Sequence, residues 1–352
     1  MPGQSSVRLA AATVRRYPRL VWAAVCLAGL VLPLSDRVLP SEWTVTQHLP
    51  VVFAYAIAGL GLTVLTGFTG LLNLGAAAFL AVGAYAYAIL TWAGHPFAIG
   101  FWPGLAAAMT CGAAAGAMIG LPTLRLRGDY VAIVTLGVGE IVQDLIRNLD
   151  PITLGTQGIN PLPRPLLPGV EFSPTAHLAY YYLYLGLLAV AVVAVSNLRR
   201  SRIGRAWVAV RDDELAARAL GIDTARAKLL AFVTSGALCA GAGALLTAFW
   251  ASSIGPGYFD FQLSVVLICI VIVGGLGSVP GALLGALLMA GLNAIVLTRI
   301  ADWVNRQGLS GTNVLAQPGN WKYLIFGLAL IIIVRYRPGG LLPARAEAEA
   351  TR

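Results

Sequence analysis

Four polar side chains lie inside an otherwise apolar run, where a charged group can line a hydrated passage or pair with an ion. Glu140, Gln143, Asp144 and Arg147 recur at spacings of three, four and seven residues, which places them on one face of a helix. A carboxylate within lipid is costly unless it is paired or hydrated. The stripe therefore either lines a passage, with Arg147 as counter-ion, or lies at the water-exposed end of its helix. We favour the second interpretation for Asp144 and Arg147 and leave Glu140 open, because it lies deeper.

The residue types needed for hydrolysis, redox chemistry or metal binding are not arranged for these reactions. No G-x-x-x-x-G-K-[ST] phosphate loop occurs, and neither Lys228 nor Lys322 follows a glycine. The four cysteines fall in apolar runs at unrelated spacings, away from the three histidines. No H-E-x-x-H or G-x-S-x-G motif is present. We therefore expect no catalytic residue, no metal site and no cofactor on this chain.

The composition is that of an integral membrane protein. A chain of 352 residues with a mean hydropathy of +0.79, 58% apolar and 11% charged, cannot present an ordinary aqueous surface. Its runs are apolar on all sides and approach the length that crosses about 30 Å of hydrocarbon, which favours helices over a barrel. The sequence predicts an all-α transmembrane bundle of about ten spans, at residues 20–35, 50–66, 74–92, 101–120, 131–147, 178–197, 229–251, 262–274, 281–298 and 320–334.

The basic residues predict the orientation of this bundle. With ten spans both termini lie on one side, and that side carries 18 of the 24 Lys and Arg residues, as expected for the cytoplasm. We therefore expect N-in and C-in topology. Removing two adjacent short spans would leave the bias intact, so eight spans remain possible. The predicted parts are a cytoplasmic tail (1–19), a transmembrane domain (20–335) with an exterior loop (148–177), and a second cytoplasmic tail (336–352).

Small residues repeat along two of the predicted spans. Gly112, Gly116 and Gly120 lie four residues apart, and a similar cluster contains Gly236 and Ala240. Such spacing lets helix backbones approach closely. We expect internal packing, with a seam between subunits as the alternative.

Two glycine-rich segments interrupt the apolar runs, one in each half of the chain. The first covers residues 66–75 and the second residues 274–281. Matching breaks can mark a substrate path, because non-helical backbone is tolerated in a membrane where it lines a cavity. The path-lining residues would then be Thr66, Thr69, Asn73, Glu140, Gly274, Gly275 and Ser278. The alternative is a plain turn in each case, and residues 262–281 either span the membrane or re-enter it.

Residues 199–228 form the only long, strongly charged segment between apolar spans. Asp212 or Asp213 can cap the start of a short helix, and Gly221 suits its left-handed C-terminal position. We expect Arg211, Arg218 and Arg226 to face water or a partner, and Leu215, Ala219 and Ile222 to rest on the membrane domain. A loop held near anionic lipid is the alternative. The residues expected to dock a soluble partner are Arg211, Asp212, Asp213, Glu214, Ala217, Arg218 and Gly221.

Five stretches resemble the permease subunits of ABC importers for branched-chain amino acids. They are GFTGLLNLGAAAFLAVGAYAYAIL from Gly67, LRLRGDYVAIVTLGVGEI from Leu124, GRAWVAVRDDELAARALGIDTARAKLLAF from Gly204, GGLGSVPGALLGALL from Gly274 and RPGGLLP from Arg337. They run in order from the second predicted span almost to the C-terminus. The first forty residues and the exterior loop match least.

The resemblance implies a multi-pass permease of the bacterial inner membrane that imports leucine, isoleucine and valine. Its implied partners are a second, homologous permease, two ABC ATPase subunits that bind ATP and Mg²⁺, and an extracytoplasmic substrate-binding protein. Membrane lipid surrounds such a permease, and no nucleic acid takes part. In this family the segment corresponding to residues 212–221 is the coupling helix, which docks in a cleft of the ATPase and transmits rigid-body movement.

Two other readings of function remain open from the sequence. A related importer for urea, short amides or another small polar solute would use the same machinery. An ion-coupled secondary transporter would need an ion site, such as Glu140 with Asn73, and no ATPase. A passive channel is disfavoured, because the sequence contains no repeated filter motif.

Overall fold

The computed structural model describes Pro33 and Phe172 and residues 46–126, 128–160, 162–165, 177–250, 253–297, 299–300, 321–337 and 339–343. Within these residues the chain is helical and contains no strand, apart from one isolated antiparallel bridge between Ile159 and Ile254. The prediction of an all-α fold is confirmed for the described part of the chain.

The main helices follow the predicted spans closely. In chain order they are α3 (Leu49–Leu62) with its π-helical continuation η2 (Thr63–Phe68), α4 (Ala76–Thr91), α5 (Phe101–Thr123), α6 (Asp129–Asn148), α7 (Asp150–Thr153), α8 (His177–Arg200), α9 (Arg202–Asp212), α10 (Glu214–Ala219), α11 (Thr224–Trp250), α12 (Phe261–Gly274), α13 (Val279–Gly291) with the π-helix η5 (Leu292–Leu297), and α15 (Trp321–Tyr336). Every predicted span from 50–66 to 320–334 coincides with a helix, whereas 20–35 lies outside the described residues apart from Pro33.

Six helical segments in the described residues are long and apolar enough to cross a membrane. They are Leu49–Phe68, Phe101–Thr123, His177–Arg200, Thr224–Trp250, Pro256–Gly274 and Val279–Leu297. Two further apolar helices are shorter, Ala76–Thr91 and Leu324–Tyr336. Helix α6 is not among them; it carries the predicted polar stripe, including Glu140, Asp144 and Arg147. The chain is a multi-pass membrane protein, and the count of ten spans stays a prediction.

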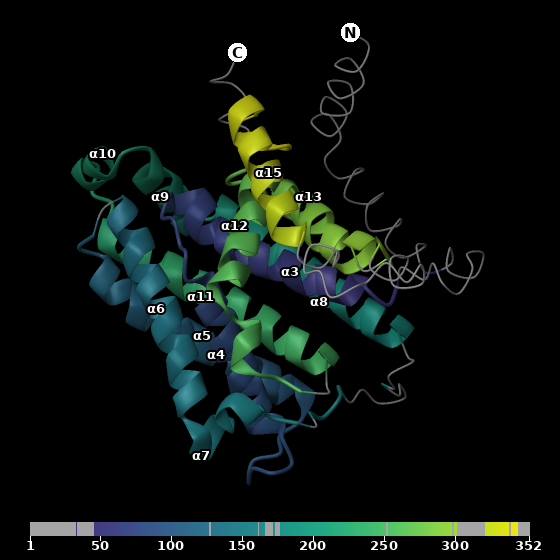
Figure 1. Cartoon of the computed structure of the whole chain (residues 1–352). Helices are drawn as coiled ribbons and strands as arrows, with labels where there is room; N and C mark the ends of the chain where they lie inside the picture. The colour runs from purple at the N-terminus through teal and green to yellow at the C-terminus, as the bar shows by residue number, and fades with distance from the viewer. Residues whose placement is uncertain are drawn as a thin grey trace.

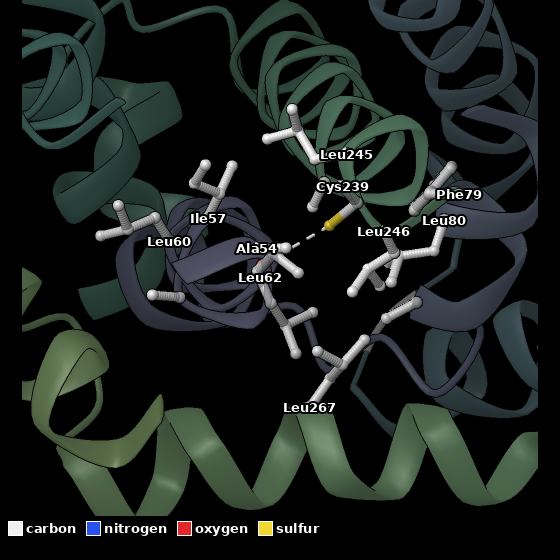
Figure 2. Packing of buried hydrophobic residues seen from close by; sticks show 14 of the residues in the cluster. Ala54, Ile57, Leu60, Leu62, Phe79, Leu80, Cys239, Leu245, Leu246 and Leu267 are labelled. Atoms are coloured by element: carbon white, nitrogen blue, oxygen red, sulfur yellow. Dashed lines mark hydrogen bonds between the residues drawn. The ribbon is translucent and has the colours of Figure 1, made fainter. Parts of the chain in front are cut away.

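Helix α11 is the centre of the bundle because its small residues admit three neighbouring helices. A Cβ atom on Gly112 of α5 would lie 2.5 Å from the carbonyl oxygen of Gly236, and one on Gly243 would lie 2.0 Å from that of Leu80 in α4. Towards α3, the Cys239 thiol lies 3.6 Å from the carbonyl oxygen of Ala58. Figure 2 shows Cys239 turned towards α3, among leucines from several helices. The small-residue spacing therefore serves internal packing.

Helices α12 and α13 form an antiparallel hairpin whose turn is the second glycine-rich segment. A Cβ on Gly285 would lie 2.0 Å from the carbonyl oxygen of Ile270, and one on Gly274 would lie 2.1 Å from that of Gly281. These glycines let two backbones touch along the hairpin. Residues 274–281 are thus a tight turn between two apolar helices.

The charged segment and the predicted exterior loop lie at opposite ends of the bundle. In Figure 1, α9 and α10 lie at the upper end and α7 at the lower end. Helix α15 runs towards the same upper end, where Leu342 donates a backbone hydrogen bond to Gly274 (2.9 Å). The hairpin turn, the charged segment and residues 339–343 therefore share one end of the molecule.

Candidate functional site

The charged segment folds into two short helices separated by Asp213. Asp213 has an extended backbone, and its side chain accepts hydrogen bonds from the amides of Leu215 (2.8 Å) and Ala216 (3.0 Å) at the start of α10. It is therefore the N-cap, while Asp212 is the last residue of α9. The sequence left both aspartates open as the cap, and the structure selects Asp213.

The C-terminal end of α10 is closed as the sequence predicts. Gly221 has a positive φ of 82°, and the Ile222 amide donates to the carbonyl of Ala217 at 3.0 Å. This bond reaches back five residues, as in the Schellman arrangement, and the buried Ala217 lies beneath Ile222. Helix α10 is thus capped at both ends.

The outward face of α10 differs from the expectation. Leu215 is 63% exposed and Leu220 82% exposed, and Ala219 is also exposed. The placement of Leu215 and Ala219 against the membrane domain was wrong, because the helix presents Ala217 to that domain instead. Ile222 is half-buried against the core, as predicted. Two leucines are thus exposed on the same short helix as Arg218, whose side chain is 58% exposed.

Glu214 and Lys228 tie α10 to the start of α11. Lys228 Nζ lies 2.8 Å from Glu214 Oε2, and the Lys228 side chain is only 5% exposed. Arg218 also bonds Glu214, at 3.2 Å, and the hydroxyl of Thr224, at 3.2 Å. Glu214 therefore holds α10 in place, a structural role that the sequence did not separate from docking. Arg226 is exposed and pairs with Asp223 at 2.9 Å.

Helix α9 is attached to the end of η2 by aromatic packing. Trp207 is fully buried, its indole nitrogen donates to the carbonyl of Ala227 at 2.7 Å, and its ring stacks on Phe68 with 6.4 Å between centroids. The guanidinium of Arg199 lies over the Phe68 ring, 5.5 Å from its centroid. The sequence analysis did not single out Trp207, although a tryptophan inside a charged segment was a usable signal.

Arg211 does not face water as predicted. Its Nη1 donates to the carbonyl of Gly67 in η2 at 2.7 Å, and the side chain is half-buried. The reason is geometric: Arg211 lies one turn beyond Trp207, on the side of α9 that the tryptophan turns towards η2. Arg211 thus contacts the membrane domain.

In the first glycine-rich segment, the polar side chains mostly serve the local backbone. The Thr69 hydroxyl donates to the carbonyl of Leu65, and Asn73 Oδ1 accepts from the Gly75 amide at 2.9 Å. Thr66 Oγ1 and Asn73 Nδ2 are buried and have no hydrogen-bond partner among the described residues. Asn73 therefore makes a turn that starts α4, and its role in a path stays a prediction.

The second segment is built in a similar way. The Ser278 hydroxyl is the N-cap of α13 and accepts from the Gly281 amide at 3.2 Å. Gly275 has a positive φ of 129°, and a Cβ there would lie 2.4 Å from the carbonyl oxygen of Leu342. Gly274 and Gly275 thus contact the chain that follows α15.

Glu140 lies where the first segment, α6 and α12 meet. It lines a cavity of about 10 Å³ together with Leu74, Ala77, Leu136, Gly139, Phe259, Asp260, Phe261 and Ser264. Asp260 is the N-cap of α12, and Ser264 accepts from the Ala77 amide of α4 at 2.9 Å. A cavity of this size holds about one water molecule. The sequence analysis missed Asp260, which could have been recognised as a cap before an apolar run.

The outer end of the α6 stripe agrees with the preferred interpretation. Asp144 and Arg147 form an exposed pair at 3.4 Å, with 65% and 45% of their side chains exposed. Gln143 turns away and donates to the carbonyl of Pro256 at 3.3 Å. Arg147 is therefore paired with Asp144, whereas Glu140, which is also exposed, lines the cavity with Asp260.

Comparison with known proteins identifies the family of this chain. A family described as "Branched-chain amino acid transport system / permease component" matches residues 45–334. The chain belongs to this permease family. It is 38% identical over 338 residues to the high-affinity branched-chain amino acid transport system permease protein LivM of Escherichia coli K12, covering 90% of this chain and 74% of LivM. LivM of Salmonella typhimurium is 38% identical over 310 residues (82% and 68%). No solved structure matches.

A second kind of relative matches a shorter part of the permease. LivH of Escherichia coli K12, also named as a permease protein of the high-affinity branched-chain amino acid transport system, is 32% identical over 166 residues, 47% of this chain and 46% of LivH. The expected resemblance is therefore confirmed. Because the family is a transport component, the chain is a permease subunit and not an enzyme.

Proposed function

We propose that this chain is the membrane-spanning subunit of an ABC importer that moves branched-chain amino acids into the bacterial cell. A second, homologous permease pairs with it, in keeping with the LivM and LivH relatives. Two ATPase subunits that bind ATP and Mg²⁺ supply the energy, and an extracytoplasmic binding protein delivers leucine, isoleucine or valine. The whole assembly lies in the inner membrane.

The observation that carries this proposal is helix α10. It is capped at both ends, stands at one end of an apolar bundle, and exposes Leu215 and Leu220 to water. Exposed apolar side chains on a small, rigid helix favour a protein partner over a loop without a partner. A cleft in an ATPase fits a helix of this length, with Arg218 at the rim of the contact.

The proposed topology places α10 and both chain ends in the cytoplasm. The support is the bias of basic residues towards that side, together with the position of residues 339–343 beside the charged segment. The loop around α7, at the other end of the bundle (Figure 1), then faces the binding protein. Ten spans agree with this arrangement, and eight would preserve it.

Purification and reconstitution test the proposal. The full chain is isolated from its native membrane with its partners, and the complex is placed in liposomes with the extracytoplasmic binding protein that co-occurs with it. We expect an ATPase subunit to co-purify. Labelled leucine should accumulate only when ATP is present on the side of the liposome membrane that the ATPase faces. Uptake of urea or a short amide in place of leucine would refute the proposed substrate and still support an ABC importer. Full uptake by this chain alone, without an ATPase, would instead establish an ion-coupled or passive transporter.

A further inference from the structure

The two glycine-rich segments meet through their backbones. A Cβ on Gly67, in the π-helix η2, would lie 2.5 Å from the amide nitrogen of Gly277, in the turn between α12 and α13. Gly277 has a positive φ of 71°, and a Cβ there would lie 3.0 Å from the Gly67 carbonyl oxygen. Both positions require glycine, because any side chain would separate the two elements. We call Gly67, Gly70 and Gly277 the glycine junction.

Arg211 is the side chain from the charged segment that contacts all three glycines. Its Nη1 donates to the Gly67 carbonyl at 2.7 Å, and the same atom would lie 3.1 Å from a Cβ on Gly277. Its Cγ would lie 3.2 Å from a Cβ on Gly70, where φ is +71°. One arginine therefore packs its stem on the first glycine-rich segment and places its charged end between both segments.

Helix α9 holds Arg211 in a fixed relation to α10. Trp207, one turn earlier, is locked by its hydrogen bond to Ala227 and by its stack on Phe68. Asp213, two residues later, caps α10. A displacement of α10 is therefore carried along α9 and delivered at Arg211.

The displacement reaches the π-helix η2, whose conformation can change. A π-helix such as η2 is rare, appears mostly as a local bulge, and is often found at functional positions. The α4 helix begins directly after the first glycine-rich segment, and α12 ends at Gly274, the first residue of the second. Ala77 at the start of α4, and Phe261 and Ser264 at the start of α12, line the cavity that contains Glu140, so α12 connects the cavity at its first residues to the glycine junction at its last.

We propose that Arg211 is a positioning residue that transmits the movement of α10 to the glycine junction, and that it does not itself bind the ATPase. This inference rests on the proposed function, because it needs an ATPase that moves α10. Without the guanidinium, α10 still docks, but its movement no longer reaches both glycine-rich segments. ATP hydrolysis then continues with less transport.

The measurement is the amount of leucine transported per ATP hydrolysed by the intact complex in liposomes. In Arg211→Ala we expect normal insertion, normal ATPase retention and a ratio lower by roughly tenfold or more, the size of effect typical of one charge-assisted hydrogen bond. Arg205→Ala is the matched control: it removes an exposed arginine from the same helix, whose Nη1 donates only to the backbone carbonyl of Arg200, at 2.9 Å, among the bonds described. An Arg211→Ala ratio equal to that of Arg205→Ala overturns the proposal. So does loss of the ATPase from inserted Arg211→Ala, which would make Arg211 a docking residue.

A cysteine pair provides a second test, in which the reduced and oxidised forms of one inserted protein are compared. A Cβ on Gly70 would lie 3.8 Å from that of Arg211, within the range a disulfide requires. In Gly70→Cys/Arg211→Cys, with the other cysteines removed, we expect a low ratio when reduced and partial recovery when oxidised, because the bond rejoins α9 to the first glycine-rich segment and leaves Gly277 without its contact to Arg211. Equal ratios in the two states overturn the proposal. A wild-type complex that lacks an ATPase would refute the proposed function instead.

Discussion

Glu214→Gln separates the structural part of the charged segment from its docking part. The substitution keeps the shape of the side chain and removes the charge that lies 2.8 Å from Lys228 Nζ. Removing one partner of a fully buried ion pair costs about 3–5 kcal/mol. Because the Glu214 side chain is 22% exposed, water can partly replace it, and we expect about 2–3 kcal/mol. At 1.4 kcal/mol per tenfold, local opening of α10 should rise by roughly 30- to 140-fold.

Amide hydrogen exchange of residues 213–222, measured in lipid nanodiscs, reports this opening directly. Asp223→Asn is the control, because its partner Arg226 is 85% exposed and such a pair contributes about 0–1 kcal/mol. Glu214→Gln/Lys228→Met should recover most of the protection, since no charge is then left buried alone. Exchange in Glu214→Gln that matches Asp223→Asn would show that the buried pair does not hold α10, and the reasoning would fail.

Three further substitutions test the other parts of the site. Arg218→Ala should lower ATPase retention about tenfold while α10 stays folded, because an exposed ion pair contributes at most about 1 kcal/mol to the helix; co-purification measures this, with Arg226→Ala as control. Gly112→Ala places a Cβ 2.1 Å from that of Ala240. This overpacking should cost about 1–3 kcal/mol of stability and lower the melting temperature. Gly186→Ala should leave the melting temperature unchanged, because a Cβ on Gly186 would have nothing within 4 Å. Glu140→Gln should lower leucine uptake at saturating binding protein, and Asp144→Asn, at the exposed end of the same stripe, should leave it unchanged.

The apolar runs predicted the helices well because lipid permits few alternatives. A backbone in hydrocarbon must satisfy its own hydrogen bonds, so a long apolar run becomes a helix. The π-helical ends η2 and η5 could not be predicted in this way, since they depend on which neighbour a helix meets. Helix α12 shows the same limit: it is 14 residues long, and the turn that follows it is explained by its packing on α13 and by a contact with Leu342, which is far away in sequence.

In the candidate site, the helix caps could be predicted from the sequence, whereas the directions in which the side chains of α9 and α10 point could not. Asp213 and Gly221 act on neighbours two to five residues away, so their spacing alone predicts their role. Whether Arg211 or Leu215 points outward depends on how α9 packs on η2, and that is set by Trp207 and Phe68, which are distant in sequence. The expected directions of both side chains were reversed for this reason.

The glycines of the two breaks form a backbone contact that the sequence did not predict, and this contact links the charged segment to the helices around Glu140. They let the backbones of η2 and the hairpin turn touch at Gly67 and Gly277, and their role in a substrate path stays a prediction. The cavity beside Glu140, at about 10 Å³, is too small for an amino acid, so a substrate path through it would require its walls to separate. Those walls come from α4, α6 and α12, and two of these three helices adjoin the contact between Gly67 and Gly277. Movement delivered at that contact therefore acts on two walls at once, which a lever attached to either segment alone could not do.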